Sequence, residues 1–324
     1  MEPLEGSNTP ETATRVRGVA PWVVGWDQPW YLARFNRNGH TVSYDRVRRL
    51  DPPEVAQAHH DTVVAATFDS RYLLRPPYDS ANVLKTHADE LLSHPGERAN
   101  DAAFCQRLEL HFDLWLNQLP LFRNRLTRNA RTQISEEAGS ALKQDFYTAE
   151  HSGTDHSLAI ELRNSAQHFL GPLAFTSIVS QSTPPGPNLT RWTLDVTAWV
   201  SQDPKIPKAL KSAFEQRGAV DIVDMIGNAL GSISNITGRF YLANADYLDN
   251  TGKRLLCLFD EAYTDTDHPP IVVHHEADQG SHGTTAQILL DPLAAGSLAA
   301  GTDAARQQAG VPIKWSETDS DGAA

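Results

Sequence analysis

Residues 236–291 constrain the fold of this chain more than any other stretch, because short apolar runs and turn residues alternate along it. Turn segments rich in glycine, aspartate and asparagine separate four apolar runs, at 240–247, 255–263, 270–277 and 284–290. Apolar runs of this length, bounded by such turn residues, are typical of β-strands that pair with their neighbours. The pattern predicts an antiparallel meander near the carboxyl end of the chain.

The strongest helical pattern lies between residues 104 and 119. Large apolar side chains recur there at spacings of three or four residues, which places them on one face of a helix. The residues on this face are Phe104, Leu108, Phe112, Trp115 and Leu119. Proline lacks the amide hydrogen that a helix interior uses, so Pro120 is expected to kink or close this helix.

Other segments carry weaker signals of secondary structure. The Asn38-Gly39 dipeptide between two β-prone segments predicts a hairpin over 30–47. Asp51, followed by two prolines, has the pattern of an N-cap residue and predicts a helix over 55–67. Further helices are expected at 80–93, 157–170, 207–216, 219–230 and 292–309, with strand character at 175–179 and 191–200.

These segments predict a fold class. Helices and antiparallel strands that are segregated along a chain favour an α+β fold over a doubly wound parallel sheet. We expect an α+β fold in which the antiparallel C-terminal meander packs against helices, with an N-terminal β-hairpin and a helical region before it.

The chain has 324 residues, of which 40% are hydrophobic, so it can bury a sizeable core without disulfides. A polar, turn-rich run at 150–156 suggests a boundary between an N-terminal hairpin and helical region, 15–150, and a mixed region, 157–315. The two regions are also compatible with a single domain. Residues 1–14 and 316–324 contain too little apolar surface to pack and are expected to be disordered tails.

The formal net charge is −12, which opposes the phosphate backbone of nucleic acids and makes a general nucleic-acid binder an unfavourable interpretation. No apolar stretch approaches the roughly twenty residues of a membrane helix, and the first residues are acidic. Cys105 and Cys257 lie in apolar runs and are expected to be buried thiols in a reducing compartment. A soluble, cytoplasmic protein without a membrane partner is therefore expected.

One candidate site for chemistry lies in the predicted meander. If 270–277 is a strand, His274 and Glu276 point to the same face, and His282 in the following turn can fold back towards them. Two imidazoles and a carboxylate form the ligand set of an iron(II) facial triad, and they can also hold zinc with an open position. A solvated strand edge, with these side chains facing water, is the alternative.

With a metal bound there, Asp278 or Asp260 would orient water or substrate, which predicts a metal-assisted enzyme acting on a small molecule. Other histidine clusters fit less well. Neither His59 and His60 with Asp61, nor the segment 151–156, has the spacing that places two imidazoles on one helix face. Both clusters are expected to be solvated surface.

A second hypothesis rests on a concentration of positive charge. Arg123, Arg125, Arg128 and Arg131 lie close together in an otherwise acidic chain. Their spacing prevents all four from sharing one helix face, although Arg125 and Arg128 can share one. Such a run is either a patch for phosphate or an acidic partner, or a solvated face that pairs with nearby glutamates.

The alternative function is therefore a non-catalytic protein-interaction or regulatory protein. It would use either the arginine segment 123–131 or the aromatic N-terminal hairpin, with Trp22, Trp26 and Trp30 nearby, against a protein partner. Because tryptophans carry so much apolar area, packing in the core is the competing interpretation of the aromatic residues.

Overall fold

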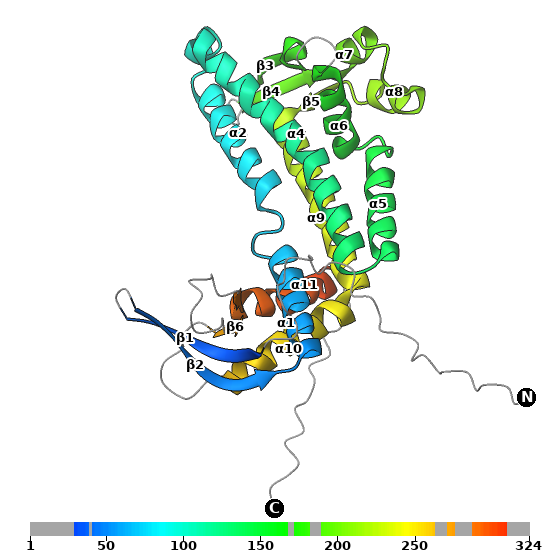
Figure 1. The fold of residues 1–324 in the computed structure, drawn as a ribbon. Coiled ribbons are helices and arrows are strands. Elements are labelled where there is room, and N and C mark those ends of the chain that lie inside the picture. The colour runs from blue at the N-terminus through cyan, green and yellow to red at the C-terminus, as the bar shows by residue number, and fades with distance from the viewer. Residues whose placement is uncertain are drawn as a thin grey trace, which may run out of the picture.

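A computed structural model of the chain describes residues 29–38, 41–167, 172–181, 189–262, 271–275 and 287–309. In these ranges the protein is predominantly helical, with two small antiparallel sheets (Figure 1). The predicted mixture of helices and antiparallel strands is confirmed, but helices account for more of the fold than the sequence indicates.

The helices are α1 (Pro52–Thr67), α2 (Arg75–Ser93), α3 (Pro95–Arg98), α4 (Ala102–Gln133), α5 (Glu136–Glu150), α6 (Asp155–Ala166), α7 (Val196–Gln202), α8 (Lys208–Glu215), α9 (Ile222–Ala243), α10 (Ala245–Ala262) and α11 (Pro292–Gln308). The strands are β1 (Trp30–Asn38), β2 (Thr41–Leu50), β3 (Thr176–Gln181), β4 (Leu189–Asp195), β5 (Ala219–Asp221), β6 (Ile271–His275) and β7 (Gln287–Leu289), and a short 3-10 helix covers Pro172–Phe175.

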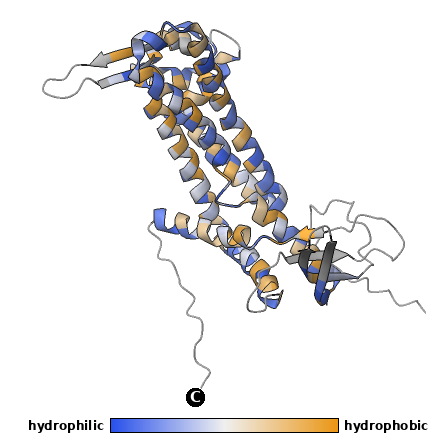
Figure 2. Cartoon of the chain, turned by 90° about the vertical axis from the view of Figure 1, so that its left-hand side faces the viewer, coloured by the Kyte–Doolittle hydropathy of each residue, from blue (hydrophilic) through white to orange (hydrophobic). Residues whose placement is uncertain are grey.

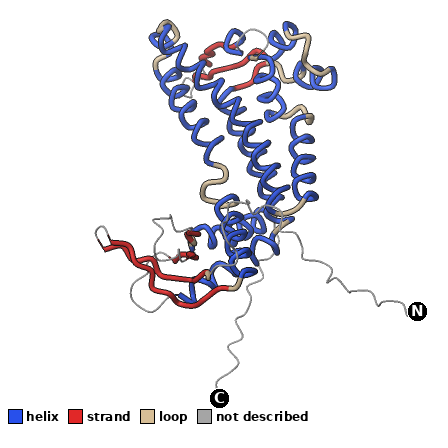
Figure 3. The backbone as a smooth tube through the Cα atoms, viewed as in Figure 1, coloured by secondary structure: helices blue, strands red, loops and turns tan. Residues whose placement is uncertain are grey.

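Two groups of elements occupy opposite ends of the molecule (Figures 1 and 3). At the hairpin end, a sheet of order β2-β1-β6-β7 lies beside α1, α10 and α11. The bundle consists of α2, α4, α5, α6 and α9, and a second sheet of order β3-β4-β5 lies at its far end with α7 and α8. Helix α9 contacts the second sheet as well as α11, so it joins the two ends.

One continuous hydrophobic core, from Trp30 to Ala305, links the two groups. The helices of the bundle carry hydrophobic and hydrophilic residues in alternation along their length, as amphipathic helices do (Figure 2). The predicted boundary at 150–156 falls at the turn between α5 and α6. In the parts of the chain that the structure describes, no helix is both long enough and apolar enough to cross a membrane.

The meander prediction is wrong for the first two of its four runs. The run 240–247 spans the end of α9 and the start of α10, and 255–262 is helical within α10. The buried residues of α10, among them Leu248, Leu255 and Phe259, recur at helical spacings that a window of eight residues does not reveal. The later two runs do contain strands: β6 and β7 pair antiparallel, and β6 also pairs with β1 of the N-terminal hairpin.

Local sequence signals account for the elements that were predicted correctly. The hairpin of β1 and β2 forms, with Trp30 opposite Leu50. At α1, the Asp51 side chain accepts a hydrogen bond of 2.9 Å from the Glu54 amide, and the Glu54 carboxylate accepts one of 2.9 Å from the Asp51 amide. This capping box satisfies two amides that the first helical turn leaves without partners.

Helix α4 buries all five predicted apolar residues, but it does not close at Pro120. The helix continues to Gln133, so the whole arginine segment is helical. The prediction of a strand over 191–200 is also corrected. The strand ends at Asp195, whose side chain accepts a 2.9 Å hydrogen bond from the Ala198 amide and so begins α7.

Candidate binding face on helix α4

The predicted metal site lies largely outside the described residues. His274 is the fourth residue of β6, where it pairs with Tyr31 of β1 and Gln287 of β7. Glu276, His282 and Asp278 fall outside the described ranges. Within those ranges no group of three or more histidine, cysteine, aspartate or glutamate residues is arranged to hold a metal ion. The site therefore stays a prediction.

Asp260, the other acid predicted to orient water or substrate, lies on α10 rather than on a strand and is exposed. The cysteine prediction is also corrected. Cys105 is only half-buried and Cys257 is exposed on α10, because the apolar run that surrounds Cys257 belongs to an amphipathic helix with one solvent-facing side.

The two polar clusters that were expected to be solvated are only partly so: the acid of the first is buried, and in the second His151 is exposed while the last two residues are buried. The carboxylate of Asp61 is buried and accepts hydrogen bonds from Arg254 at 2.7 and 2.8 Å and from Gln57 at 2.8 Å. His60 Nε2 lies 2.7 Å from the hydroxyl of Tyr247, which in turn donates to the carbonyl of Gln133. These contacts join α1 to α10 and to the end of α4.

In the second cluster, Asp155 forms an ion pair with Arg217 and accepts a 2.8 Å hydrogen bond from Asn228. His156 beside it is buried, and its ring lies close to the backbone of Ala229. Burial, together with the positive charge of Arg123, lowers the pKa of His156 to about 4. The uncharged ring therefore behaves as part of the core at neutral pH.

The charged segment of the sequence forms one side of a groove between α4 and α5, which we call the basic groove. The basic groove has a volume of about 320 Å³. Its lining comprises Arg123, Asn124, Thr127, Arg128 and Arg131 from α4, and Lys143, Tyr147 and Glu150 from α5. Arg125, the remaining arginine of the run, lines a different cavity, on the other flank of the exposed face of α4.

Two of the four cations in the basic groove are held by acids. Arg123 donates to both carboxylate oxygens of the buried Glu150, at 2.5 and 2.7 Å, and Arg131 pairs with Glu136 at 2.8 Å. Arg128 and Lys143 are exposed and form no ion pair with any acid that the structure describes. The groove therefore has two fixed charge pairs and two cations available to a ligand.

The lining also holds a neutral donor without a partner. The hydroxyl of Thr127 is buried, the residue being 8% exposed, and it has no hydrogen-bond partner among the described residues. Such groups are uncommon in native proteins, because burying a hydroxyl without a partner costs free energy. A carboxylate that enters the groove would supply an acceptor.

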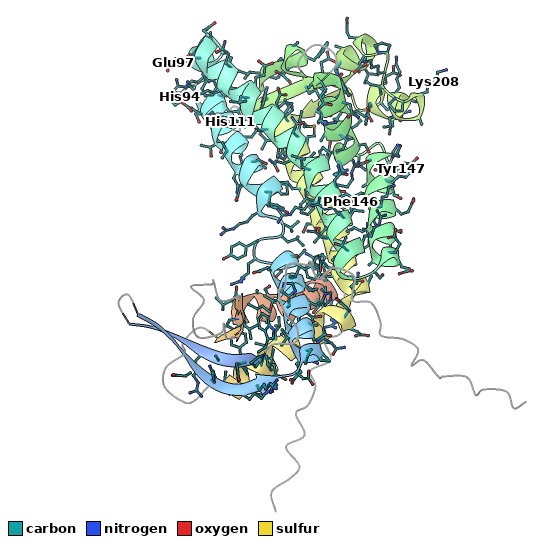
Figure 4. All side chains as sticks on the ribbon, in the orientation of Figure 1. His94, Glu97, His111, Phe146, Tyr147 and Lys208 are labelled. Carbon is teal, nitrogen blue, oxygen red and sulfur yellow. The ribbon has the colours of Figure 1, made fainter. Side chains whose placement is uncertain are left out.

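The aromatic residues of α5 show which side of this helix faces outward. Phe146 is buried in the bundle and Tyr147 points away from it (Figure 4). Tyr147 stacks on His151 with a ring separation of 4.0 Å, so the groove has an ordered aromatic rim.

The arginines of the groove are evident in the sequence because they are close together in the chain. Lys143 and Glu150 are not, because they reach the groove only when α5 folds back against α4. Comparison of the chain with family models, with curated proteins and with solved structures gives no match in any of the three.

Proposed function

We propose that this protein is a non-catalytic binding protein that holds an acidic segment of a protein partner in the basic groove. The observation that carries the proposal is the gathering of four cationic side chains in one groove of a chain whose formal net charge is −12. Arg128 and Lys143 have no acid partner within the described ranges, so their charges are available for a carboxylate.

The chemistry of the groove favours carboxylates of a peptide over the backbone of a nucleic acid. Arginine presents a planar set of donors that matches a carboxylate, and lysine adds a compact positive charge. A long nucleic acid would extend beyond the groove into the field of an acidic protein, where repulsion reduces affinity. A short acidic segment confines its charge to the groove.

The Arg123–Glu150 pair supports the site without blocking it. Because Glu150 is buried and bonded through both oxygens, its charge is compensated, and Arg123 is held in one orientation. The Arg123–Glu150 pair is therefore already ordered before the partner binds. The side chains that lose conformational freedom on binding are mainly Arg128 and Lys143.

The test is fluorescence anisotropy with a labelled oligoglutamate peptide that has one central alanine. Reversing the two available charges, with Arg128→Glu and Lys143→Glu together, should raise Kd about tenfold or more, because attraction becomes repulsion. Added salt should weaken binding to the parent protein. The matched control is Lys205→Glu with Lys208→Glu, which makes the same change in net charge; Lys208 lies on α8, away from the groove (Figure 4). Equal Kd values for the two double variants would refute the proposal.

The metal-assisted reaction predicted from the sequence is the second proposal. It is supported by one observation: β6 forms as a strand, which is the local structure that the hypothesis assigns to His274. Elemental analysis of the purified protein tests it. Stoichiometric iron or zinc that is lost in the His274→Ala, His282→Ala double variant supports the site, whereas metal-free protein of normal stability, or metal retained in the double variant, removes it.

A further inference from the structure

A second cavity flanks the exposed face of α4, along the edge opposite to the basic groove. Its volume is about 160 Å³. The walls come from the end of α1, from the turn before α2 and from α4, and they include Leu73, Phe122 and Leu126. Leu121 and Tyr72 stand at the edge of the cavity and are 60% and 50% exposed. We call this cavity the apolar pocket.

The turn that forms one wall is fixed from behind. The hydroxyl of Tyr241 on α9 donates to the carbonyl of Phe68, and Ser70 Oγ donates to the carbonyl of Ser297 on α11 at 2.8 Å. The pocket is therefore preformed, which lowers the cost of ordering on binding. Its volume is close to the roughly 150 Å³ of an engineered apolar cavity that binds benzene. It can accept one phenyl-sized or leucine-sized side chain.

Positive charge surrounds this apolar pocket. Arg125 lines it directly, and the guanidinium of Arg75 lies 4.7 Å from the centre of the Tyr72 ring at its edge. Arg71 also lies over that ring, at 5.0 Å, but it is paired with Asp69. Arg75 and Arg125 form no ion pair with any acid in the ranges that the structure describes. A ligand that combines an apolar group with nearby acidic groups is complementary to this surface.

One exposed face of α4 connects the apolar pocket to the basic groove. Leu114, Leu121, Arg125 and Arg128 follow one another at intervals of seven, four and three residues, so they share a side of the helix. Leu121 and Arg125 line the apolar pocket, and Arg128 lines the basic groove. A peptide that crosses this face can reach both.

We propose that the apolar pocket receives one large apolar side chain, of the size of phenylalanine or leucine, from an acidic peptide segment whose carboxylates bind Arg125, Arg75 and the basic groove. This inference rests on the proposed function, because it assigns an anchor to the same acidic partner. A buried side chain surrounded by charged contacts is the arrangement found in the centre of specific protein interfaces.

The experiment compares two labelled oligoglutamate peptides, one with a central phenylalanine and the other with a central alanine. The parent protein should bind the phenylalanine peptide at least about tenfold more tightly, since burial of an aromatic side chain is strongly favourable. Ala66 is an exposed residue near the end of α1 that lines the pocket. Ala66→Phe should abolish the preference for the phenylalanine peptide, because the new ring occupies the space that the peptide side chain would fill. Ala300→Phe, at an exposed position of α11, should preserve it.

A second pair of variants protects the test against a folding defect in Ala66→Phe. Leu121→Ser removes an exposed side chain at the pocket and should reduce the preference for phenylalanine severalfold. Its control, Leu293→Ser, removes a leucine that is 67% exposed on α11 and should have no effect.

The outcomes separate this inference from the proposed function. Equal affinity of the parent protein for the two peptides, or a preference retained in both Ala66→Phe and Leu121→Ser, would overturn the anchor. The basic groove is then judged on its own by the effect of Arg128→Glu and Lys143→Glu on the alanine peptide. Failure of both peptides to bind would overturn both proposals.

Discussion

At the scale of single residues, the sequence is a poor guide to which polar side chains are buried. Asp61 and His156 belong to short polar runs that look solvated, yet both are in the interior. The partner that permits the burial of Asp61 is Arg254, which is 193 residues away in the chain. No local pattern contains that information, because burial of a charge depends on a partner that only the fold brings close.

The burial of His156 predicts a dependence of stability on pH. Its pKa is about 4 in the folded protein and about 6.5 in an unfolded chain, so below pH 6.5 the unfolded state takes up a proton that the folded state excludes. The contribution of the neutral, buried His156 to the free energy of unfolding is fully present above pH 6.5 and is lost as the pH falls towards 4. Between pH 7 and pH 5 the loss should be on the order of 2 kcal/mol.

Urea unfolding at pH 7 and pH 5 measures this contribution. His156→Leu should reduce the difference in unfolding free energy between the two pH values by that amount, whereas His94→Gln, at an exposed position, should leave it unchanged. The same pH dependence in His156→Leu and in the parent protein would contradict the assignment.

The Asp61–Arg254 pair predicts a non-additive effect on stability. Arg254→Met leaves a buried carboxylate without its cation and should lower the free energy of unfolding by about 2 kcal/mol. This loss is smaller than that expected for a fully buried ion pair, because solvent screens the partly exposed Arg254. The double variant with Asp61→Leu should be more stable than Arg254→Met alone, because it also removes the unpaired charge. Additive losses in urea titrations would show that the two residues are not coupled.

At the scale of elements, prediction from sequence succeeds where the signal is local and long. The cap at Asp51 and the apolar stripe from Phe104 to Leu119 specify α1 and α4, because several turns of helix agree on one buried face. It fails for the runs 240–247 and 255–263, where an apolar segment of eight or nine residues fits a strand or a helix. The sequence predicts only the side of the basic groove that α4 forms, because its arginines are close together in the chain. The residues from α5 reach the groove only through helix packing.

The spacing between α4 and α5 depends on Gly139. A Cβ atom built on Gly139 would lie 2.6 Å from the Cβ and 2.9 Å from the Cα of Arg131, so the helices can approach this closely only with glycine there. Gly139→Ala should therefore push α5 away from α4, lower the free energy of unfolding by about 1 to 3 kcal/mol and weaken oligoglutamate binding.

Gly231→Ala on α9 is the matched control, because nothing lies within 4 Å of the added atom. It should raise the free energy of unfolding by up to about 1 kcal/mol, as alanine does in an unobstructed helix interior, and leave the peptide Kd unchanged. Thermal or urea unfolding together with peptide anisotropy distinguishes the two variants. An equal response of the two glycines would contradict the packing argument.

At the scale of the whole molecule, a single core from Trp30 to Ala305 supports a helical bundle on which α4 presents one exposed face. That face has an apolar pocket on one flank and a basic groove on the other, although the formal net charge of the protein is −12. The overall charge keeps polyanions away in general, and the local cations admit a short acidic segment. One face of one helix is therefore the proposed binding surface.

Hydrogen exchange measured by mass spectrometry, with and without a saturating amount of the phenylalanine peptide, locates binding most directly. If the peptide binds this face of α4, exchange should slow in three segments, 66–76, 118–131 and 143–150, and should not change in α8 or in the hairpin of β1 and β2. Protection confined to the hairpin, or exchange that is unchanged throughout α4 at saturation, would contradict this prediction.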